Sequence, residues 1–249
     1  IYWHNFIEVS GFADAVAEKR LKGGEDLLLS FNHGYRPFGN TLAPHASYSV
    51  SKKLFEIINN KTSRQLISIH NQETAAENEL YQSGNSAFLG LYKNLGINTE
   101  LFSVTGKTSM QSWLPYFTNA QKIISVHNTF TSQDDFSFSN SPNLYFCICI
   151  NANLYIENKL PPIDLMVKNN CNIVLGTDSY ASNFNLNIME EINSIQKNFP
   201  HVPLPSILKW ATSNGARALG IDNKFGSFEK GKKPGLVLID KDKGLAKKI

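Results

Sequence analysis

The chain has 249 residues, of which 42% are hydrophobic and 18% charged, and this balance excludes a disordered or fibrous protein. A chain of this length and composition can bury a large core. Its formal net charge is +3, from 24 basic and 21 acidic residues spread without blocks, so neither nucleic acid nor a membrane surface is an expected partner.

Strands and helices alternate in the hydrophobic pattern from the first residue onward. In chain order, the first half is predicted to hold a strand at 1–9, a helix at 12–21, a strand at 40–45, a helix at 52–59, a strand at 65–70 and a helix at 73–81. A glycine-punctuated connection at 83–117 is longer than ordinary loops and is a candidate lid or pocket wall. The second half is predicted to hold strands at 122–127 and 145–150, a helix at 161–169, a strand at 172–178, helices at 187–198 and 204–219, and a β-like end at 226–240.

Buried strands that alternate with helices indicate an α/β fold with a parallel sheet, and their number suggests most of a (β/α)8 barrel of the TIM type. The pattern supplies six such strands, and a six-stranded remnant would leave two long edges unpaired. The chain also begins at Ile1 rather than at methionine. We therefore expect an N-terminal segment before Ile1 to supply the first two strands of the barrel.

The three cysteines, Cys147, Cys149 and Cys171, lack Cys-x-x-Cys spacing, and the first two lie two residues apart on an apolar strand. They are expected to be reduced core residues. The sequence has no apolar run of about 18 residues and no signal-peptide pattern. It therefore predicts a cytoplasmic protein, and it leaves a homo-oligomer open.

Three of the predicted strands end in a titratable side chain. The apolar runs Leu-Ile-Ser-Ile and Ile-Ile-Ser-Val lead into His70 and His127, and Asn-Ile-Val-Leu-Gly-Thr leads into Asp178. Packing alone would favour valine or leucine at these positions. In a parallel barrel the carboxyl ends of the strands meet at one face, where catalytic residues and metal ligands lie. We therefore expect the three residues to converge in one site.

Four motifs occur in a fixed order along the chain: Ser-Ile-His-Asn-Gln-Glu at 68–73, Val-His at 126–127, Leu-Gly-Thr-Asp at 175–178 and Ala-Thr-Ser-Asn-Gly-Ala-Arg-Ala-Leu-Gly at 211–220. This set resembles the amidohydrolase superfamily, and most closely its branch of chlorohydrolases and cytosine-deaminase-like aminohydrolases. The end of the chain is similar to that branch's return into a small β-sandwich. The resemblance implies a partial hydrolase barrel at 1–222 and a β-sandwich segment at 223–249.

The resemblance also implies one divalent metal ion, zinc or iron. His70 matches the metal ligand on the family's fifth barrel strand, and Asp178 matches the ligand on the eighth. Imidazole and carboxylate suit such an ion, which lowers the pKa of bound water toward neutrality. Asp178 would also be the base for that water, Glu73 would shuttle protons to the leaving group, and His127 would orient the water. His45 matches a substrate-binding position.

The chain departs from the family pattern at two places. The family's other two metal ligands form a His-x-His pair on the first strand, and none of the six histidines here forms such a pair. We expect the pair in the preceding segment, because the chain given cannot build the metal site by itself. Where the branch usually carries Pro-x-Ser-Asn, this chain has Ile-Asn-Ala-Asn, so Asn153 alone is retained.

The implied function is a metal-dependent hydrolase that deaminates an amino-substituted nitrogen heterocycle or nucleoside, with aminodeoxyfutalosine as one candidate substrate. A chlorohydrolase or a cyclic amidohydrolase stays open, because the pocket selects the leaving group. A catalytically inactive binding protein is the alternative if the His-x-His pair is truly absent. Ordinary roles are also open: Asp178 as a turn or helix cap, Glu73 as a helix-end carboxylate and His45 as a loop histidine.

Overall fold

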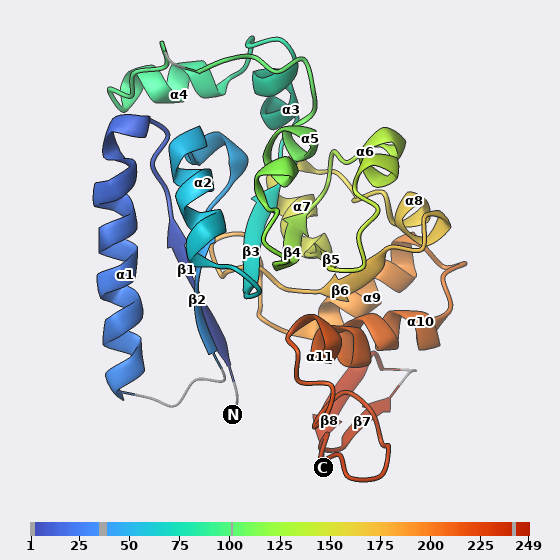
Figure 1. Cartoon of the computed structure of the whole chain (residues 1–249). Coiled ribbons are helices and arrows are strands. Elements are labelled where there is room, and N and C mark those ends of the chain that lie inside the picture. The colour runs from blue at the N-terminus through green and yellow to red at the C-terminus, as the bar shows by residue number, and fades with distance from the viewer. Residues whose placement is uncertain (1–2, 35–38, 101, 241–242) are drawn as a thin grey trace.

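The computed structural model describes residues 3–34, 39–100, 102–240 and 243–249. Its first six strands run in parallel pairs through the middle of the molecule (Figure 1). β1 (His4–Val9) pairs with β2 (Gly39–Pro44). A second sheet contains, in this order, β3 (Leu66–Asn71), β4 (Lys122–His127), β5 (Leu144–Ile148) and β6 (Asn172–Leu175).

The two sheets continue into each other between β2 and β3. The backbone amide of His70 donates to the carbonyl of His45 at 2.9 Å, and Ala46 forms an isolated parallel bridge with His70. The strands therefore follow one another in chain order, which is the arrangement of a (β/α)8 barrel and confirms the predicted fold class. Within the described residues, the outer edges of β1 and β6 have no strand partner.

The pleat of the strands separates an outer core from an inner one. In β3, Ile67 and Ile69 are buried in the cluster that packs on the helices, so Ser68 and His70 project from the opposite face. Side chains from five different strands meet on that opposite face: Phe6, Leu66, Ile124, Val126, Cys147 and Val174. Because they come from all around the sheet, this face is the interior of the barrel, and His70 belongs to it.

Helices surround the strands, with α1 and α2 against β1 and β2 (Figure 1). Their bounds are α1 (Ala17–Gly34), α2 (Lys52–Lys61), α3 (Ala75–Gln82), α4 (Phe88–Asn94), α5 (Ser109–Trp113), α6 (Gln133–Phe138), α7 (Ile150–Glu157), α8 (Ile163–Lys168), α9 (Ile188–Asn198), α10 (Leu204–Lys209) and α11 (Gly215–Ala218). Ser51 caps α2, because its hydroxyl accepts the amide of Leu54 at 3.3 Å. None of the described helices is long and apolar enough to cross a bilayer.

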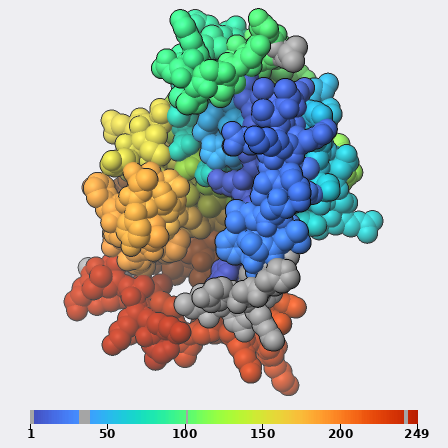
Figure 2. Space-filling model, turned by 90° about the vertical axis from the view of Figure 1, so that its left-hand side faces the viewer, coloured from blue at the N-terminus to red at the C-terminus, as the bar shows by residue number. Residues whose placement is uncertain are grey.

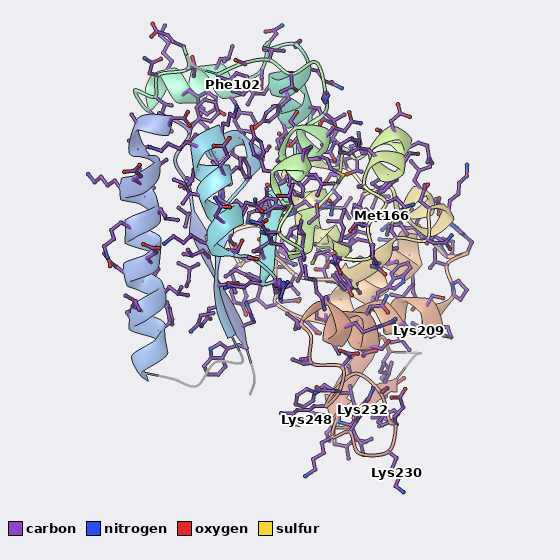
Figure 3. The ribbon with its side chains drawn as sticks, viewed as in Figure 1. Phe102, Met166, Lys209, Lys230, Lys232 and Lys248 are labelled. Carbon is purple, nitrogen blue, oxygen red and sulfur yellow. The ribbon has the colours of Figure 1, made fainter. Side chains whose placement is uncertain are left out.

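The connection at 83–117 carries α4 and α5 at the end of the molecule toward which the strands point (Figure 1). Phe102, labelled in Figure 3, lies in this connection, and its ring centroid is 5.5 Å from that of Phe12. The ring of Phe12 also stacks on Tyr92 at 4.4 Å. These aromatic contacts pack the connection onto the segment that follows β1.

The chain ends in an antiparallel hairpin of β7 (Val237–Asp240) and β8 (Leu245–Lys248). It lies below α10 and α11 in Figure 1, and Figure 2 shows the C-terminal residues, in red, at the base of the molecule. Lys230, Lys232 and Lys248 belong to this end (Figure 3). The side-chain amide of Asn193 in α9 donates to the carbonyl of Gly244 at 3.0 Å. The division into a barrel at 1–222 and a β-sandwich segment at 223–249 stays a prediction.

Candidate active site

Three of the predicted site residues meet at the carboxyl ends of β3, β4 and β6. Ligand atoms of Glu73, His127 and Asp178 all lie within 4.8 Å of one another. The Oε1 atom of Glu73 is 3.6 Å from Nε2 of His127, whose side chain is only 1% exposed. The structure thus joins one imidazole and two carboxylates from three separate strand ends.

The backbone around this group is held in an unfavourable conformation. The φ angles of Gln72, His127 and Asp178 are +47°, +72° and +60°, in the left-handed region. Such a conformation costs a residue other than glycine about 1 kcal/mol or more, and residues held in it cluster at functional sites. The chain turns sharply at each of these three positions, which lie at the end of β4 and just beyond the ends of β3 and β6.

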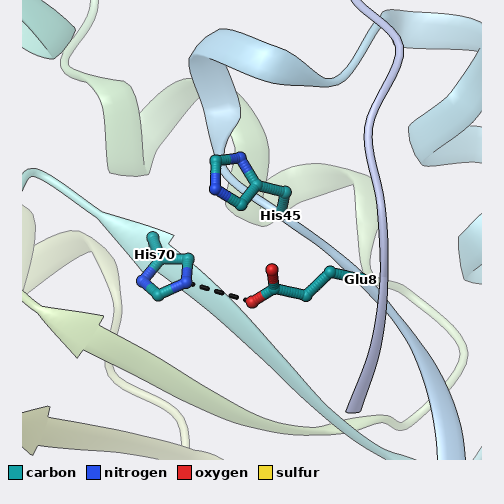
Figure 4. Close-up of side chains that lie close together, drawn as sticks. All are labelled: Glu8, His45 and His70. Atoms are coloured by element: carbon teal, nitrogen blue, oxygen red, sulfur yellow. Dashed lines mark hydrogen bonds and ion pairs between the residues drawn. The ribbon is translucent and has the colours of Figure 1, made fainter. Parts of the chain in front are cut away.

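A second group of side chains lies beside the first, at the ends of β1, β2 and β3. Ligand atoms of Glu8, His45 and His70 lie within 4.8 Å of one another. The Oε1 atom of Glu8 is 3.1 Å from Nε2 of His70, the contact dashed in Figure 4. The rings of His45 and His70 have their centroids 5.2 Å apart.

His70 connects the two groups, because its Nδ1 atom lies 3.1 Å from Nε2 of His127. Burial would lower its pKa, but the hydrogen-bonded carboxylate of Glu8, with the charges of Glu73 and Asp178, outweighs burial and raises the pKa. The negative charge of Asp178 therefore stabilises the protonated imidazole of His70. The predicted ligands His70 and Asp178 nonetheless fall in different groups of three, joined through His127.

The neighbours of His127 fix the position of its proton. Its Nδ1 atom lies 3.0 Å from Oδ1 of Asn153. An amide oxygen only accepts hydrogen bonds, so Nδ1 carries the proton and Nε2 offers a lone pair to the site. Burial lowers the pKa of His127, although the charge of Glu73 opposes that shift. The retained Asn153 thus sets the tautomer of this imidazole.

Asp178 lies in the loop at the carboxyl end of β6, three residues beyond the last residue of the strand. β6 ends at Leu175, three residues earlier than predicted. Just beyond it, the backbone amide of Gly176 still donates to the carbonyl of Ile148 at 2.9 Å. The hydroxyl of Ser182 donates to Oδ2 of Asp178. The next helix, α9, is capped by Asn187, so Asp178 does not serve as its cap.

Sequence reasoning missed Glu8, although a signal was present. Glu8 is the second-last residue of β1, as His70 is of β3. The rule that selected His70, a titratable residue at the carboxyl end of a strand, therefore also selects Glu8. The hydrogen bond to His70 lowers the pKa of Glu8, so its carboxylate is ionised at neutral pH.

Both groups of three side chains contain the kinds of atom that bind a divalent metal ion. Imidazole nitrogens and carboxylate oxygens are the ligands that zinc and iron accept, and here they lie within 4.8 Å of one another. Both ring nitrogens of His70 already have protein partners, Glu8 and His127. Each ring nitrogen has one in-plane position, taken by a proton or a lone pair, so a ligand role for His70 requires one of these contacts to open.

The strands form a parallel barrel, and imidazole and carboxylate groups lie at their carboxyl ends. The protein is therefore a TIM-barrel protein with its candidate site at that face. The model of the amidohydrolase family matches residues 13–249. The chain belongs to the amidohydrolase family.

Known proteins similar to this chain include deaminases and, among solved structures of the same fold, an atrazine chlorohydrolase of Arthrobacter aurescens (TM-score 0.69, 17% identity, covering 95% of this chain and 53% of that one). A 5-methylthioadenosine/S-adenosylhomocysteine deaminase of Thermoanaerobacter pseudethanolicus is 32% identical over 214 residues, which cover 81% of this chain and 44% of that protein. The structure of Helicobacter pylori aminofutalosine deaminase superposes with a TM-score of 0.79 and 22% identity, covering 93% of this chain and 58% of that one. The structure of an adenosine deaminase of Xanthomonas campestris with bound zinc superposes with a TM-score of 0.63 and 24% identity. The match covers 90% of this chain and 48% of that one. The chain spans about half the length of the curated relatives it matches.

Proposed function

We propose that this protein is a metal-dependent aminohydrolase that removes ammonia from an amino-substituted nitrogen heterocycle, in particular an adenine-type nucleoside. The observation that carries the proposal is the meeting of Glu73, His127 and Asp178 within 4.8 Å at the strand ends. The deaminase names of its relatives support the reaction class. The substrate class follows from the nucleosides in those names.

The metal ion is proposed to be zinc, which an adenosine deaminase of the same fold binds, with iron as the second candidate. His70 and Asp178 would be the ligands that the described residues supply. A bound divalent ion supplies a water molecule that can attack at neutral pH.

The proposed reaction forms a bond between a water oxygen and the ring carbon and breaks the bond from that carbon to the amino group. Asp178 takes a proton from the water, and that proton passes through Glu73 to a ring nitrogen. When the oxygen on the ring carbon becomes a carbonyl, its second proton passes through Glu73 to the leaving amine, so that ammonia departs. His127 would orient the water through its Nε2 lone pair, because Asn153 keeps the proton on Nδ1; this role requires the contact of Nε2 with Nδ1 of His70 to open.

His45 is proposed to contact the substrate. Its Nδ1 atom lies 2.7 Å from the hydroxyl of Ser49, so Nε2 is the nitrogen that we assign to the substrate. Burial lowers the pKa of His45, which favours the neutral imidazole at neutral pH. A neutral ring can bond an uncharged heterocycle without a buried charge.

The test is ammonia release by metal-loaded full-length protein across a panel that contains adenosine, methylthioadenosine, cytosine and a chloro-substituted triazine. We expect release from at least one purine nucleoside and loss of that activity on chelation. Release of chloride alone would make the protein a chlorohydrolase. Binding of a nucleoside without turnover in the metal-loaded protein would support a non-catalytic role and refute the proposal.

A further inference from the structure

Glu77 is a fully buried carboxylate in the first turn of α3 and lies outside both groups of site residues. Its Oε1 atom accepts the backbone amide of Glu73 at 2.8 Å. Its Oε2 atom accepts the backbone amide of Gln72, also at 2.8 Å. One side chain therefore holds the two consecutive amides of the turn that leads out of β3.

Two hydroxyl groups complete the surroundings of this carboxylate. The Oε2 atom accepts from Ser109 at 3.1 Å and from Ser47 at 3.4 Å, and the two hydroxyl oxygens are 2.7 Å apart. Ser109 begins α5, and Ser47 follows His45 by two residues. Glu77 thus ties the turn at 72–73 to the loop that carries His45.

The turn that Glu77 holds determines where Glu73 points. Gln72 has a φ angle of +47°, an unfavourable conformation that reverses the chain immediately before Glu73. The reversed chain directs the Glu73 carboxylate to within 3.6 Å of Nε2 of His127. If Glu77 could not accept both amides, one or both would be buried without a partner, and the turn would relax.

We propose that Glu77 is a positioning residue for Glu73: it fixes the turn so that the Glu73 carboxylate faces His127 and the substrate. The catalytic part of this inference rests on the proposed function. The geometric part, that Glu77 orders the two amides, does not.

The first experiment is a double-mutant cycle between Glu77→Gln and Glu73→Gln, measured as kcat and KM for ammonia release by the full-length protein. Glu77→Gln should lower kcat by about tenfold or more and change KM by less than about threefold. In protein that already carries Glu73→Gln, the added Glu77→Gln substitution should lower kcat by less than about threefold, because its effect acts through Glu73. Independent, multiplicative losses would overturn the proposal.

Glu191→Gln is the matched control. Glu191 is also fully buried and accepts a backbone amide, that of Asn151, at 3.2 Å. Its hydrogen bonds go to Asn151 and, through Asn183, to the carbonyl of Thr177 beside Asp178, and not to the turn at 72–73. Glu191→Gln therefore controls for the loss of a buried carboxylate that does not hold this turn.

The second experiment needs no activity and keeps the inference separable from the proposed function. Hydrogen exchange at the amides of Gln72 and Glu73 should accelerate by more than about tenfold in Glu77→Gln and stay unchanged in Glu191→Gln. Unchanged protection in Glu77→Gln would overturn the inference even if the enzyme is a deaminase. If Glu77→Gln does not fold, Glu77→Asp replaces it, because its shorter side chain cannot span both amides.

Discussion

Replacing Glu77 with glutamine should remove a pH dependence from the stability of the fold. Burial raises the pKa of Glu77 from 4.5 to about 7, against its bonds to Gln72, Glu73 and Ser109. A raised pKa means that the folded state holds this proton more tightly than the unfolded state does. The stabilisation is therefore fully present below pH 4.5 and is lost as the pH rises through about 7.

The size of the effect follows from the same shift. The difference, 7 − 4.5 = 2.5 pH units, at about 1.4 kcal/mol each gives about 3–4 kcal/mol. The other titrating groups of the site, among them His45, His70 and His127, are present in both proteins. Their contributions cancel when wild type and Glu77→Gln are compared.

The assay is urea denaturation of metal-free wild type and Glu77→Gln across the pH range. The free energy of unfolding of wild type, relative to that of the variant, should fall by about 3–4 kcal/mol between pH 4.5 and a pH above 7. Glu79→Gln is the control, because Glu79 lies exposed on the same helix, and it should leave the pH profile of wild type unchanged. A difference between wild type and Glu77→Gln that does not vary with pH would refute the reasoning.

The remaining predictions concern the site and its support. Glu73→Gln should keep its metal but lose about 100- to 10,000-fold in turnover, whereas Asp178→Asn should lose both metal and turnover. Metal content and initial rates of the two variants are measured side by side. Equal metal loss in both would make Glu73 a ligand. Gly176→Ala should destabilise the fold by about 1–3 kcal/mol in urea denaturation, because its Cβ would meet Sγ of Cys147 at 2.8 Å. Gly90→Ala has open space and should cost nothing, so equal losses at Gly176 and Gly90 would contradict the packing argument.

The strand ends were predictable because their signal is local. The two-residue period of β3 and β4 places the side chains, and parallel pairing then aligns the carboxyl ends of neighbouring strands. His70 and His127 therefore followed from the sequence as residues at one end of the sheet. Their ligand and catalytic roles stay predictions, since they depend on the metal and the substrate.

The bounds of α1 show where a local signal misleads. The hydrophobic spacing predicts a helix at 12–21, yet α1 begins at Ala17 and continues through Gly23 and Gly24 to Gly34. A Cβ on Gly24 would lie 2.7 Å from Cγ2 of Val9. This glycine lets α1 approach β1 closely, and a contact between two elements is not visible in a local pattern.

The support of the site was likewise beyond the sequence. Glu8 and His70 are 62 residues apart, and their contact exists only once β1 and β3 stand in the same barrel. Glu77 reads from sequence as an ordinary glutamate in the first turn of a helix. Its role as acceptor for two amides depends on the left-handed turn at Gln72, which no periodicity signals.

A zinc titration of metal-free, full-length protein decides whether the protein is a metal-dependent deaminase. Ammonia release from methylthioadenosine or adenosine and bound metal are determined on the same samples. We expect turnover to rise in proportion to bound zinc, to level off at about one ion per chain and to be absent in Asp178→Asn. Undiminished turnover in metal-free protein, or no turnover of any amino-heterocycle at full zinc occupancy, would contradict the proposed function.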